Sequence, residues 1–159
     1  MEVNITTASL SERHHVENLM QFYIYDFTEF TRASILEDGT FRTLPDLDSY
    51  WSEQYKNHIY LIKAGGEVAG FILMKETEDT RKYNYLAHFF ILRKFRRSGI
   101  GRKAAEIILK KYKGEWELYQ LENNIPAQIF WDKVIKDISD GEVRVWVENG
   151  RRYQNFFCK

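Results

Sequence analysis

The alternation of hydrophobic and polar positions predicts short strands interrupted by three helices. A first strand is expected over residues 3–8. A helix follows, with Ser11 where an N-cap belongs. Its apolar side chains recur at helical spacing, at Val16, Leu19, Met20, Tyr23, Phe27 and Phe30. Residues 31–49, which include Gly39 and Pro45, predict a loop with one helical turn that continues over residues 50–56.

The middle of the chain has the pattern of consecutive antiparallel strands. Residues 59–63 and 68–74 flank Gly65-Gly66, a two-glycine hairpin signal. A polar turn over residues 77–82 leads into a long, aromatic and β-prone stretch over residues 83–92. Three antiparallel strands in a row are the simplest arrangement of these segments.

After this stretch the pattern alternates between helix and strand. Gly99 and Gly101 open a helix, residues 116–121 form a strand, and Asn123 or Asn124 caps another helix with Pro126 in its first turn. Residues 143–147 and 153–157 then form a closing hairpin through Asn149-Gly150, which places Cys158 in an edge strand. The order predicts an α/β (α+β) fold in one domain, residues 1–159, with a mixed, mostly antiparallel sheet and helices on both faces.

Composition narrows the classes of function. The 44% of apolar residues supply a core, and 23 basic against 23 acidic residues leave no global field to attract nucleic acid or a membrane surface. The single cysteine, Cys158, excludes an internal disulfide and a cysteine zinc site. His14 and His15 point about 100° apart on a helix, so we expect no metal. No apolar run spans a bilayer and no secretory signal is evident, so a cytoplasmic protein is expected.

The segment from Arg93 to Lys103 carries the clearest chemical signal. Six of its eleven residues are basic and none is acidic. A strand, a glycine-containing turn and a helix N-terminus aim unpaired backbone N–H groups at one point, and Gly99 and Gly101 let a ligand approach the backbone. Ser98 offers a hydroxyl and the arginines offer charge, so the segment suits a diphosphate. The plainer alternative is a solvated basic turn.

Two other phosphate-binding motifs fit this segment poorly. Gly99-x-Gly101-x-x-Ala104, with Glu122 about twenty residues on, formally matches the dinucleotide fingerprint. That fingerprint begins directly at a strand end in a parallel unit, whereas here six mostly basic residues intervene and the upstream strands are expected to be antiparallel. A P-loop is excluded because no Gly-Lys-Ser/Thr follows at the required spacing.

Two motifs resemble the GCN5-related N-acetyltransferase (GNAT) superfamily. Residues Arg96 to Gly101 match its Arg/Gln-x-x-Gly-x-Gly/Ala signature, and the preceding residues 89–92 resemble the family's strand. Residues Asn124 to Trp131 resemble its Asn-x-x-Ala-x-x-Phe-Tyr helix start. The element order agrees over nearly the whole chain. The resemblance is to a bacterial-type branch, and no motif points to a particular substrate.

The resemblance implies acetyl-CoA-dependent transfer of an acetyl group to a primary amine of a small molecule or a protein. Acetyl-CoA would lie in a V-shaped opening between two splayed parallel strands that end near Leu92 and Leu121. Pantetheine would pair with the backbone of residues 90–92, and Asn124 would reach it. The cofactor residues implied are Phe90, Ile91, Leu92, Arg96, Arg97, Ser98, Gly99, Ile100, Gly101, Arg102 and Asn124.

The sequence departs from the family pattern at three places. Arg93 stands where a proline is frequent and Arg97 where a glycine is frequent, and both sites are expected to tolerate ordinary backbone angles. Trp131 stands where the family often has a tyrosine, and an indole cannot protonate a thiolate at neutral pH. Either another hydroxyl, Tyr119 or Tyr153, serves as the acid, or the thiolate departs unassisted. Trp131 is then mainly a packing residue.

Candidates for the remaining catalytic roles come from the same region. A backbone N–H near Ile91 or Leu92 is the oxyanion donor that the resemblance implies. His88 is the first candidate for the base: alternation places it on one face with Leu86 and Phe90, and a satisfied core histidine is the alternative. Glu122, at the end of the next strand, is the second candidate.

The acceptor side gives weaker signals. Asp26 and Glu29 share a helix face and are bracketed by Tyr23 and Phe27, which would suit a cationic amine, although a solvated helix face gives the same pattern. Two alternative functions remain: a CoA-binding sensor without turnover, and a nucleic-acid-binding module that uses residues 93–103. The C-terminal hairpin offers an edge for a homodimer.

Overall fold

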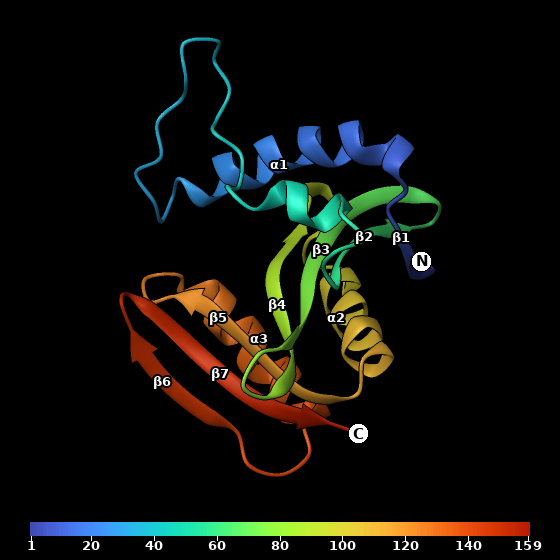
Figure 1. Cartoon of the computed structure of the whole chain (residues 1–159), viewed down its shortest axis with the longest axis vertical. Helices are drawn as coiled ribbons and strands as arrows, with labels where there is room; N and C mark the ends of the chain where they lie inside the picture. The colour runs from blue at the N-terminus through green and yellow to red at the C-terminus, as the bar shows by residue number, and fades with distance from the viewer.

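The computed structural model describes residues 1–159 as one seven-stranded sheet with helices on both faces (Figure 1). The sheet order is β1-β2-β3-β4-β5-β7-β6, and every neighbouring pair is antiparallel except β4 and β5. The strands are β1 (Val3–Thr7), β2 (Asn57–Ala64), β3 (Glu67–Glu78), β4 (Lys82–Ile91), β5 (Gly114–Leu121), β6 (Arg144–Glu148) and β7 (Arg151–Cys158). The predicted mixed, mostly antiparallel sheet is confirmed.

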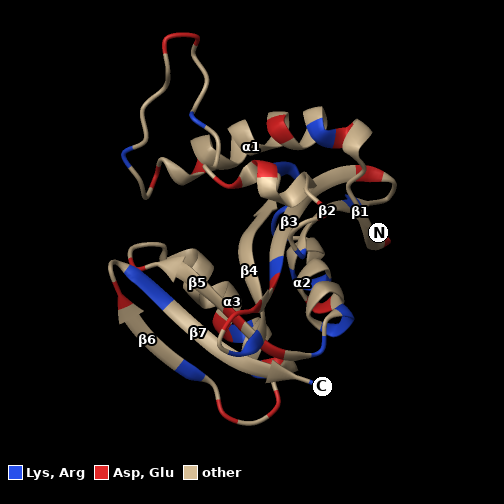
Figure 2. Cartoon of the chain, viewed as in Figure 1, with Lys and Arg blue, Asp and Glu red and all other residues tan.

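Three α-helices complete the fold: α1 (Arg13–Phe27), α2 (Ile100–Lys111) and α3 (Ile125–Ile138). Short 3-10 turns lie at η1 (Leu10–Glu12), η2 (Leu47–Trp51) and η3 (Arg93–Phe95). No helix is long and apolar enough to cross a membrane. Basic and acidic positions are spread over the elements rather than gathered on one of them (Figure 2).

The ends of the helices differ in part from the predicted ones. Ser9, not Ser11, forms the capping box: its backbone N–H donates to Glu12 at 3.0 Å, and one 3-10 turn separates it from α1. Helix α3 begins at Asn124, whose side-chain oxygen accepts the Ala127 N–H. Helix α1 ends at Phe27, so Glu29 lies beyond it and does not share a helix face with Asp26.

The sheet separates two hydrophobic cores. One core joins α2 and α3 to the sheet and includes Trp116, Phe156 and Ile108. The other joins α1 and η2 to the opposite face, around Phe71 and Met20. Strands β2 and β3 are buried on both faces by these two cores, which explains why their sequence is almost continuously apolar rather than alternating.

A bulge in β4 changes which side chains share a face. Leu73 of β3 pairs with His88 and Met74 pairs with Leu86, which leaves Ala87 as the extra residue. Leu86 therefore packs in the core of α2 and α3, whereas His88 contacts Tyr23 of α1 on the other face. The prediction that His88 lies on one face with Leu86 was wrong, because the alternation is interrupted at Ala87.

The C-terminal hairpin is inserted differently from the prediction. Strand β7 pairs with β5 on one side and β6 on the other, so it is an interior strand, and β6 forms the exposed edge. Cys158 is opposite Gly114 of β5 and is buried, and burial raises its thiol pKa to about 11. The edge-strand placement of Cys158 was therefore wrong, and the thiol is inert.

Candidate functional site

Strands β4 and β5 diverge after a short parallel ladder. Their paired residues are Asn84 with Trp116, Tyr85 with Glu117 and Leu86 with Leu118, directly before the bulge at Ala87. Beyond that point the end of β4 has no strand partner on the β5 side. The sheet thus opens into a V at the carboxyl ends of its only parallel pair.

The open edge of β4 presents the backbone of Phe89 and Ile91. The Leu92 N–H donates to the Ala69 carbonyl at 2.8 Å, so the backbone of Leu92, and of Phe90 by alternation, faces β3. The backbone groups of Phe89 and Ile91 face the opening instead. Leu92 is therefore excluded as the oxyanion donor, and Ile91 or Phe89 is the candidate. The backbone groups of Phe90 and Leu92 make no hydrogen bonds toward the opening.

The turn before α2 contains two left-handed residues. Gly99, the N-cap of α2, has φ +80° and Arg97 has φ +60°. The prediction of ordinary backbone angles at Arg97 was wrong: this is the conformation that glycine favours, and an arginine adopts it here at a cost in strain. Arg93 lies in η3 with ordinary helical geometry. The turn leaves the first amides of α2 free to meet an anion.

A cavity of about 530 Å³ lies against this turn, and we call it the loop cavity. It is lined by Asp26, Phe27, Phe89, Phe90, Ile91, Arg96, Arg97, Gly99, Gly101, Arg102, Asn124, Pro126, Ala127, Phe130 and Trp131. Three arginines therefore stand around the N-terminus of α2. This concentration of positive charge and free amides is suited to a diphosphate.

Two of the three arginines of the loop cavity form ion pairs. Arg96 donates through Nε to the Ile91 carbonyl at 2.9 Å and forms an ion pair with Asp26 at 2.8 Å. Arg102 pairs with Glu106 and Asp137. Arg97 has no carboxylate partner.

Two predicted cofactor residues turn their side chains elsewhere. The Ser98 hydroxyl donates to the Phe95 carbonyl at 2.7 Å, and Ser98 lies outside the loop cavity. The Ile100 side chain is buried in the core. The hydroxyl contact expected of Ser98 was therefore wrong, and only backbone amides of these two residues can serve an anion.

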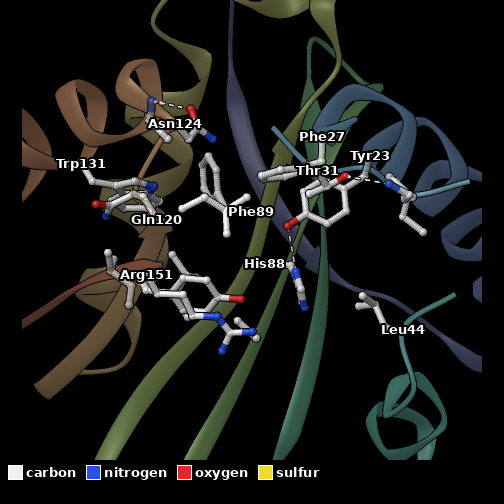
Figure 3. A pocket seen from close by; sticks show the side chains of 18 of the residues that line it. Tyr23, Phe27, Thr31, Leu44, His88, Phe89, Gln120, Asn124, Trp131 and Arg151 are labelled. Carbon is white, nitrogen blue, oxygen red and sulfur yellow. Dashed lines mark hydrogen bonds between the residues drawn. The ribbon is translucent and has the colours of Figure 1, made fainter. Parts of the chain in front are cut away.

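A second cavity, of about 420 Å³, lies deeper in the V, and we call it the central cavity (Figure 3). It is lined by Tyr23, Ile24, Phe27, Thr31, Ala33, Arg42, Thr43, Leu44, Pro45, Leu86, Ala87, His88, Phe89, Leu118, Tyr119, Gln120, Leu121, Asn124, Ala127, Trp131 and Arg151. It shares five lining residues with the loop cavity: Phe27, Phe89, Asn124, Ala127 and Trp131. The two cavities therefore meet at the open end of β4.

The junction is built from one amide and a group of aromatic rings. Asn124 is buried, and its oxygen caps α3, so its side-chain N–H groups remain available toward both cavities. Trp131 is buried edge-to-face against Phe89 at 5.2 Å and Phe130 at 5.0 Å. This packing agrees with the structural role predicted for Trp131.

His88 reaches the central cavity from β4, with its Nδ1 at 2.8 Å from the Tyr23 hydroxyl (Figure 3). Burial lowers the pKa of His88 to about 4; the charges of Lys75 and Arg151 add to this and Asp46 opposes it. Burial also raises the pKa of Tyr23. His88 is therefore neutral at pH 7, with a weakly basic ring.

The other catalytic candidates separate in the structure. Tyr119 lines the central cavity, with its ring 5.4 Å from that of Tyr153, and Tyr153 lies outside both cavities. Glu122 is exposed and lies outside both cavities, because β5 ends at Leu121 and the chain turns outward before α3. The assignment of Glu122 as a base was therefore wrong.

The acidic and aromatic wall predicted on α1 is only half present. Tyr23 and Phe27 line the central cavity, but Glu29 is exposed and lines neither cavity. Asp26 lies in the loop cavity and binds Arg93 and Arg96. Burial raises its pKa, and the bonds to Arg96 and Arg93 outweigh this, so the net pKa is lowered. The carboxylate is thus occupied, and a cationic amine would not find it free.

Several lining residues were missed in the sequence. Arg42, Thr31 and Leu44 belong to the segment between α1 and η2, which has no pattern of its own. Arg151 opposes Leu121 across the β5–β7 ladder. The Asn149-Gly150 turn signal predicted the hairpin with its second strand from residue 153, so Arg151 was left in the turn, and the pairing of β7 with β5 has no local signature.

Comparison with known proteins then decides the family. The family model described as acetyltransferase (GNAT) family matches residues 20–135, which include the V, the turn before α2 and most of α3. The chain belongs to the GNAT acetyltransferase family. The family shares acetyl-CoA as acyl donor, and the predicted membership is confirmed. Among curated proteins, none matches the chain.

Solved structures of acetyltransferases share the whole fold. An acetyltransferase from Thermus thermophilus superposes with a TM-score of 0.70 at 13% identity, over 98% of this chain and 96% of that one. A GNAT acetyltransferase from Staphylococcus aureus gives 0.68 at 16% identity, over 99% and 100%. The PaiA N-acetyltransferase of Thermoplasma acidophilum, in complex with coenzyme A, gives 0.64 at 15% identity, over 99% of each chain.

No cluster of three or more histidine, cysteine, aspartate or glutamate side chains is placed to hold a metal ion.

Proposed function

We propose that this GNAT protein transfers the acetyl group of acetyl-CoA to a primary amine. The observation that carries the proposal is the meeting of the two cavities. A cationic cavity at a helix N-terminus opens, through Asn124 and Phe89, into a second cavity deep enough for a small molecule. A donor with a diphosphate at one end and a reactive group at the other fits this arrangement.

The loop cavity fits CoA at three points. The amides of residues 97–102 and the unpaired guanidinium of Arg97 suit the pyrophosphate. The open backbone edge at Phe89 and Ile91 suits the amides of pantetheine, as a strand would. The Asn124 amide N–H groups face the same path. When bound, acetyl-CoA supplies an acetyl thioester as the acyl donor.

The residues at the junction have defined tasks in this proposal. The N–H of Ile91 or Phe89 stabilises the negative charge that develops on the carbonyl oxygen. His88 accepts a proton from the amine, and its low pKa restricts that role to an amine that is already close to neutral. Tyr119 lines the central cavity and takes the acid role, since Trp131 has no hydroxyl and the Tyr23 hydroxyl is bound to His88.

The nucleic-acid alternative is weakened by pairing within the basic segment. Of its six basic residues, Arg93, Lys94, Arg96 and Arg102 form ion pairs with carboxylates. Two of these carboxylates, Asp26 and Glu67, come from elements far away in the sequence. Only Arg97 and Lys103 are left without a carboxylate partner, which reduces the charge that the segment offers to a nucleic-acid backbone.

A turnover assay distinguishes an acetyltransferase from a CoA-binding sensor without activity. The protein is incubated with acetyl-CoA and a panel of primary amines, and release of free thiol is followed together with the mass of the N-acetylated product. We expect product with at least one amine class. Acetyl-CoA binding without product across the panel would establish the sensor, and salt-dependent DNA binding without any effect of CoA would establish the nucleic-acid module.

A further inference from the structure

The central cavity has no carboxylate in its wall. Of its 21 lining residues, 13 are hydrophobic, and the two charged side chains are Arg42 and Arg151. His88 is neutral there. Asp46, the acidic residue whose charge reaches His88, lies outside the wall and is held by Lys75 at 2.6 Å. The cavity thus presents positive charge and apolar surface, and no group that would balance a second positive charge.

Arg151 is held toward this cavity without a counterion. Its guanidinium lies over the Tyr119 ring, 4.5 Å from the centroid, and no carboxylate forms a salt bridge with it. The neighbouring Arg152 points to the other face of β7 and is bound by Asp132 at 3.0 Å and by the Gln120 oxygen. The unpaired arginine is therefore on the cavity side and the paired one is not.

Arg42 is the second charged side chain of the central cavity. It belongs to the segment between α1 and η2, lines the central cavity and forms no salt bridge. Between the two arginines the wall is aromatic and aliphatic, with Phe27, Leu44 and Phe89 in it, and Figure 3 shows these groups around one opening with Arg151 and His88. The cavity therefore combines an apolar surface with two guanidinium groups.

We propose, on the basis of the function proposed above, that the acceptor is an amino acid or a close analogue: a primary amine that carries a carboxylate and an apolar or aromatic body. The carboxylate binds Arg151, assisted by Arg42, and the body packs among Phe27, Leu44 and Phe89. Arg151 is thus a specificity-determining residue. Polyamines and other dications are poor acceptors, because their second charge would lose water beside two guanidinium groups.

The same two arginines explain how a weakly basic His88 can accept a proton from the amine. Positive groups near an amine favour its neutral form and lower the pKa of the ammonium. The α-ammonium group of an amino acid is a somewhat stronger acid than the ammonium of a lysine side chain, so less is needed to bring it toward its neutral form. We therefore expect the amine to lose its proton more readily in the cavity than in water, which lowers the basicity required of His88.

Calorimetric titration of matched amines tests the inference without turnover. L-Phenylalanine, phenethylamine and spermidine are titrated into the protein alone and into the protein with CoA. Phenethylamine keeps the ring and the amine and lacks only the carboxylate. We expect phenylalanine to bind about 10- to 100-fold more tightly than phenethylamine, and spermidine to bind least.

Variants assign the discrimination to Arg151. Arg151→Gln should reduce the phenylalanine-to-phenethylamine ratio to near one, and Arg151→Lys should leave an intermediate ratio because it keeps charge without the planar fork. Arg144→Gln is the matched control: it removes the same charge from the same hairpin, outside both cavities. Melting temperatures verify that each variant is folded.

Three results would overturn the inference: phenethylamine or spermidine binding as tightly as phenylalanine, a ratio unchanged in Arg151→Gln, or an equal fall in Arg144→Gln. Failure of the proposed function is a different result. In that case no acetylated product forms in the turnover assay, while the amine preference is still measured by binding to the protein alone.

Discussion

Arg97 departs from the family pattern at a cost in conformational free energy. Its φ of +60° is a conformation that costs an L-residue about 1–2 kcal/mol, whereas glycine loses about 0.5–1 kcal/mol in chain entropy. We expect Arg97→Gly to be more stable than Arg97→Ala by roughly 0.5–1 kcal/mol, measured by urea denaturation. Both variants lose the guanidinium, so both should weaken acetyl-CoA binding equally. Equal stability would show that the turn is not strained.

His88 gives a pH signature of burial. Its pKa is about 4 in the folded chain and near 6.5 when unfolded, so between these values the unfolded state binds the extra proton. The stability that His88 contributes is complete above pH 6.5 and is lost as the pH falls toward 4. We expect wild type to lose up to about 3 kcal/mol relative to His88→Gln over this window. Parallel stability curves would contradict the burial of a neutral imidazole.

His88 also has a prediction for turnover. Because it faces the central cavity and not the loop cavity, His88→Ala should lower kcat while acetyl-CoA affinity is kept. The measurement is steady-state kinetics with calorimetric CoA binding beside it. An unchanged kcat would remove His88 from the reaction and leave it as a core histidine bound to Tyr23.

At the residue scale, the sequence predicted positions better than orientations. The glycines of the turn and Asn124 could be placed because helix starts have strong local rules. The side of β4 on which Leu86 lies could not be predicted, because the bulge at Ala87 is set by pairing with β3. The left-handed backbone of Arg97 was hidden for a similar reason: nothing in an arginine indicates such an angle.

At the scale of elements, Gly70 controls how β3 and β4 approach each other. A Cβ built at this position would lie 1.8 Å from the Phe90 carbonyl oxygen, in the strand whose far edge forms the V. We expect Gly70→Ala to destabilise the protein by about 3 kcal/mol or more, because two backbones must separate. Denaturation curves measure the loss.

A matched glycine separates this clash from ordinary glycine effects. Gly66→Ala has a positive φ of +81° and no atom within 4 Å of its new Cβ, so its cost should be only about 1 kcal/mol. A Gly70→Ala loss no larger than that of Gly66→Ala would contradict the close approach of β3 and β4.

Most elements could be predicted from the sequence, and their neighbours only in part. Hairpins with glycine turns, such as β2–β3 and β6–β7, specify their own partner because the chain returns at once. The insertion of β7 between β5 and β6 depends on a long-range pairing, so Cys158 was assigned to an edge. The prediction of a homodimer through this hairpin now concerns the exposed strand β6.

At the scale of the whole molecule, the central cavity joins segments that the sequence keeps apart. Its wall takes residues from α1, the segment before η2, β4, β5, α3 and β7. Motifs predicted most of the loop cavity because its wall comes mainly from the end of β4, the turn before α2 and the start of α3, which have local signatures. The acceptor side has no such motif, and an acidic pair expected on one helix face suggested a cationic ligand where the assembled wall holds two arginines.

The central claim is that the turn before α2 binds CoA, and the melting temperature with acetyl-CoA tests it most directly. Gly99→Asp places a carboxylate at the turn, and Gly141→Asp is the matched control, because Gly141 has a similar φ of +84° and equal open space far from both cavities.

At acetyl-CoA concentrations about 100 times the Kd, we expect about 2.7 kcal/mol of stabilisation and a rise of roughly 5–10 °C for wild type and for Gly141→Asp. Gly99→Asp should show no rise. An unmoved melting temperature in wild type, or an equal rise in Gly99→Asp, would contradict the claim.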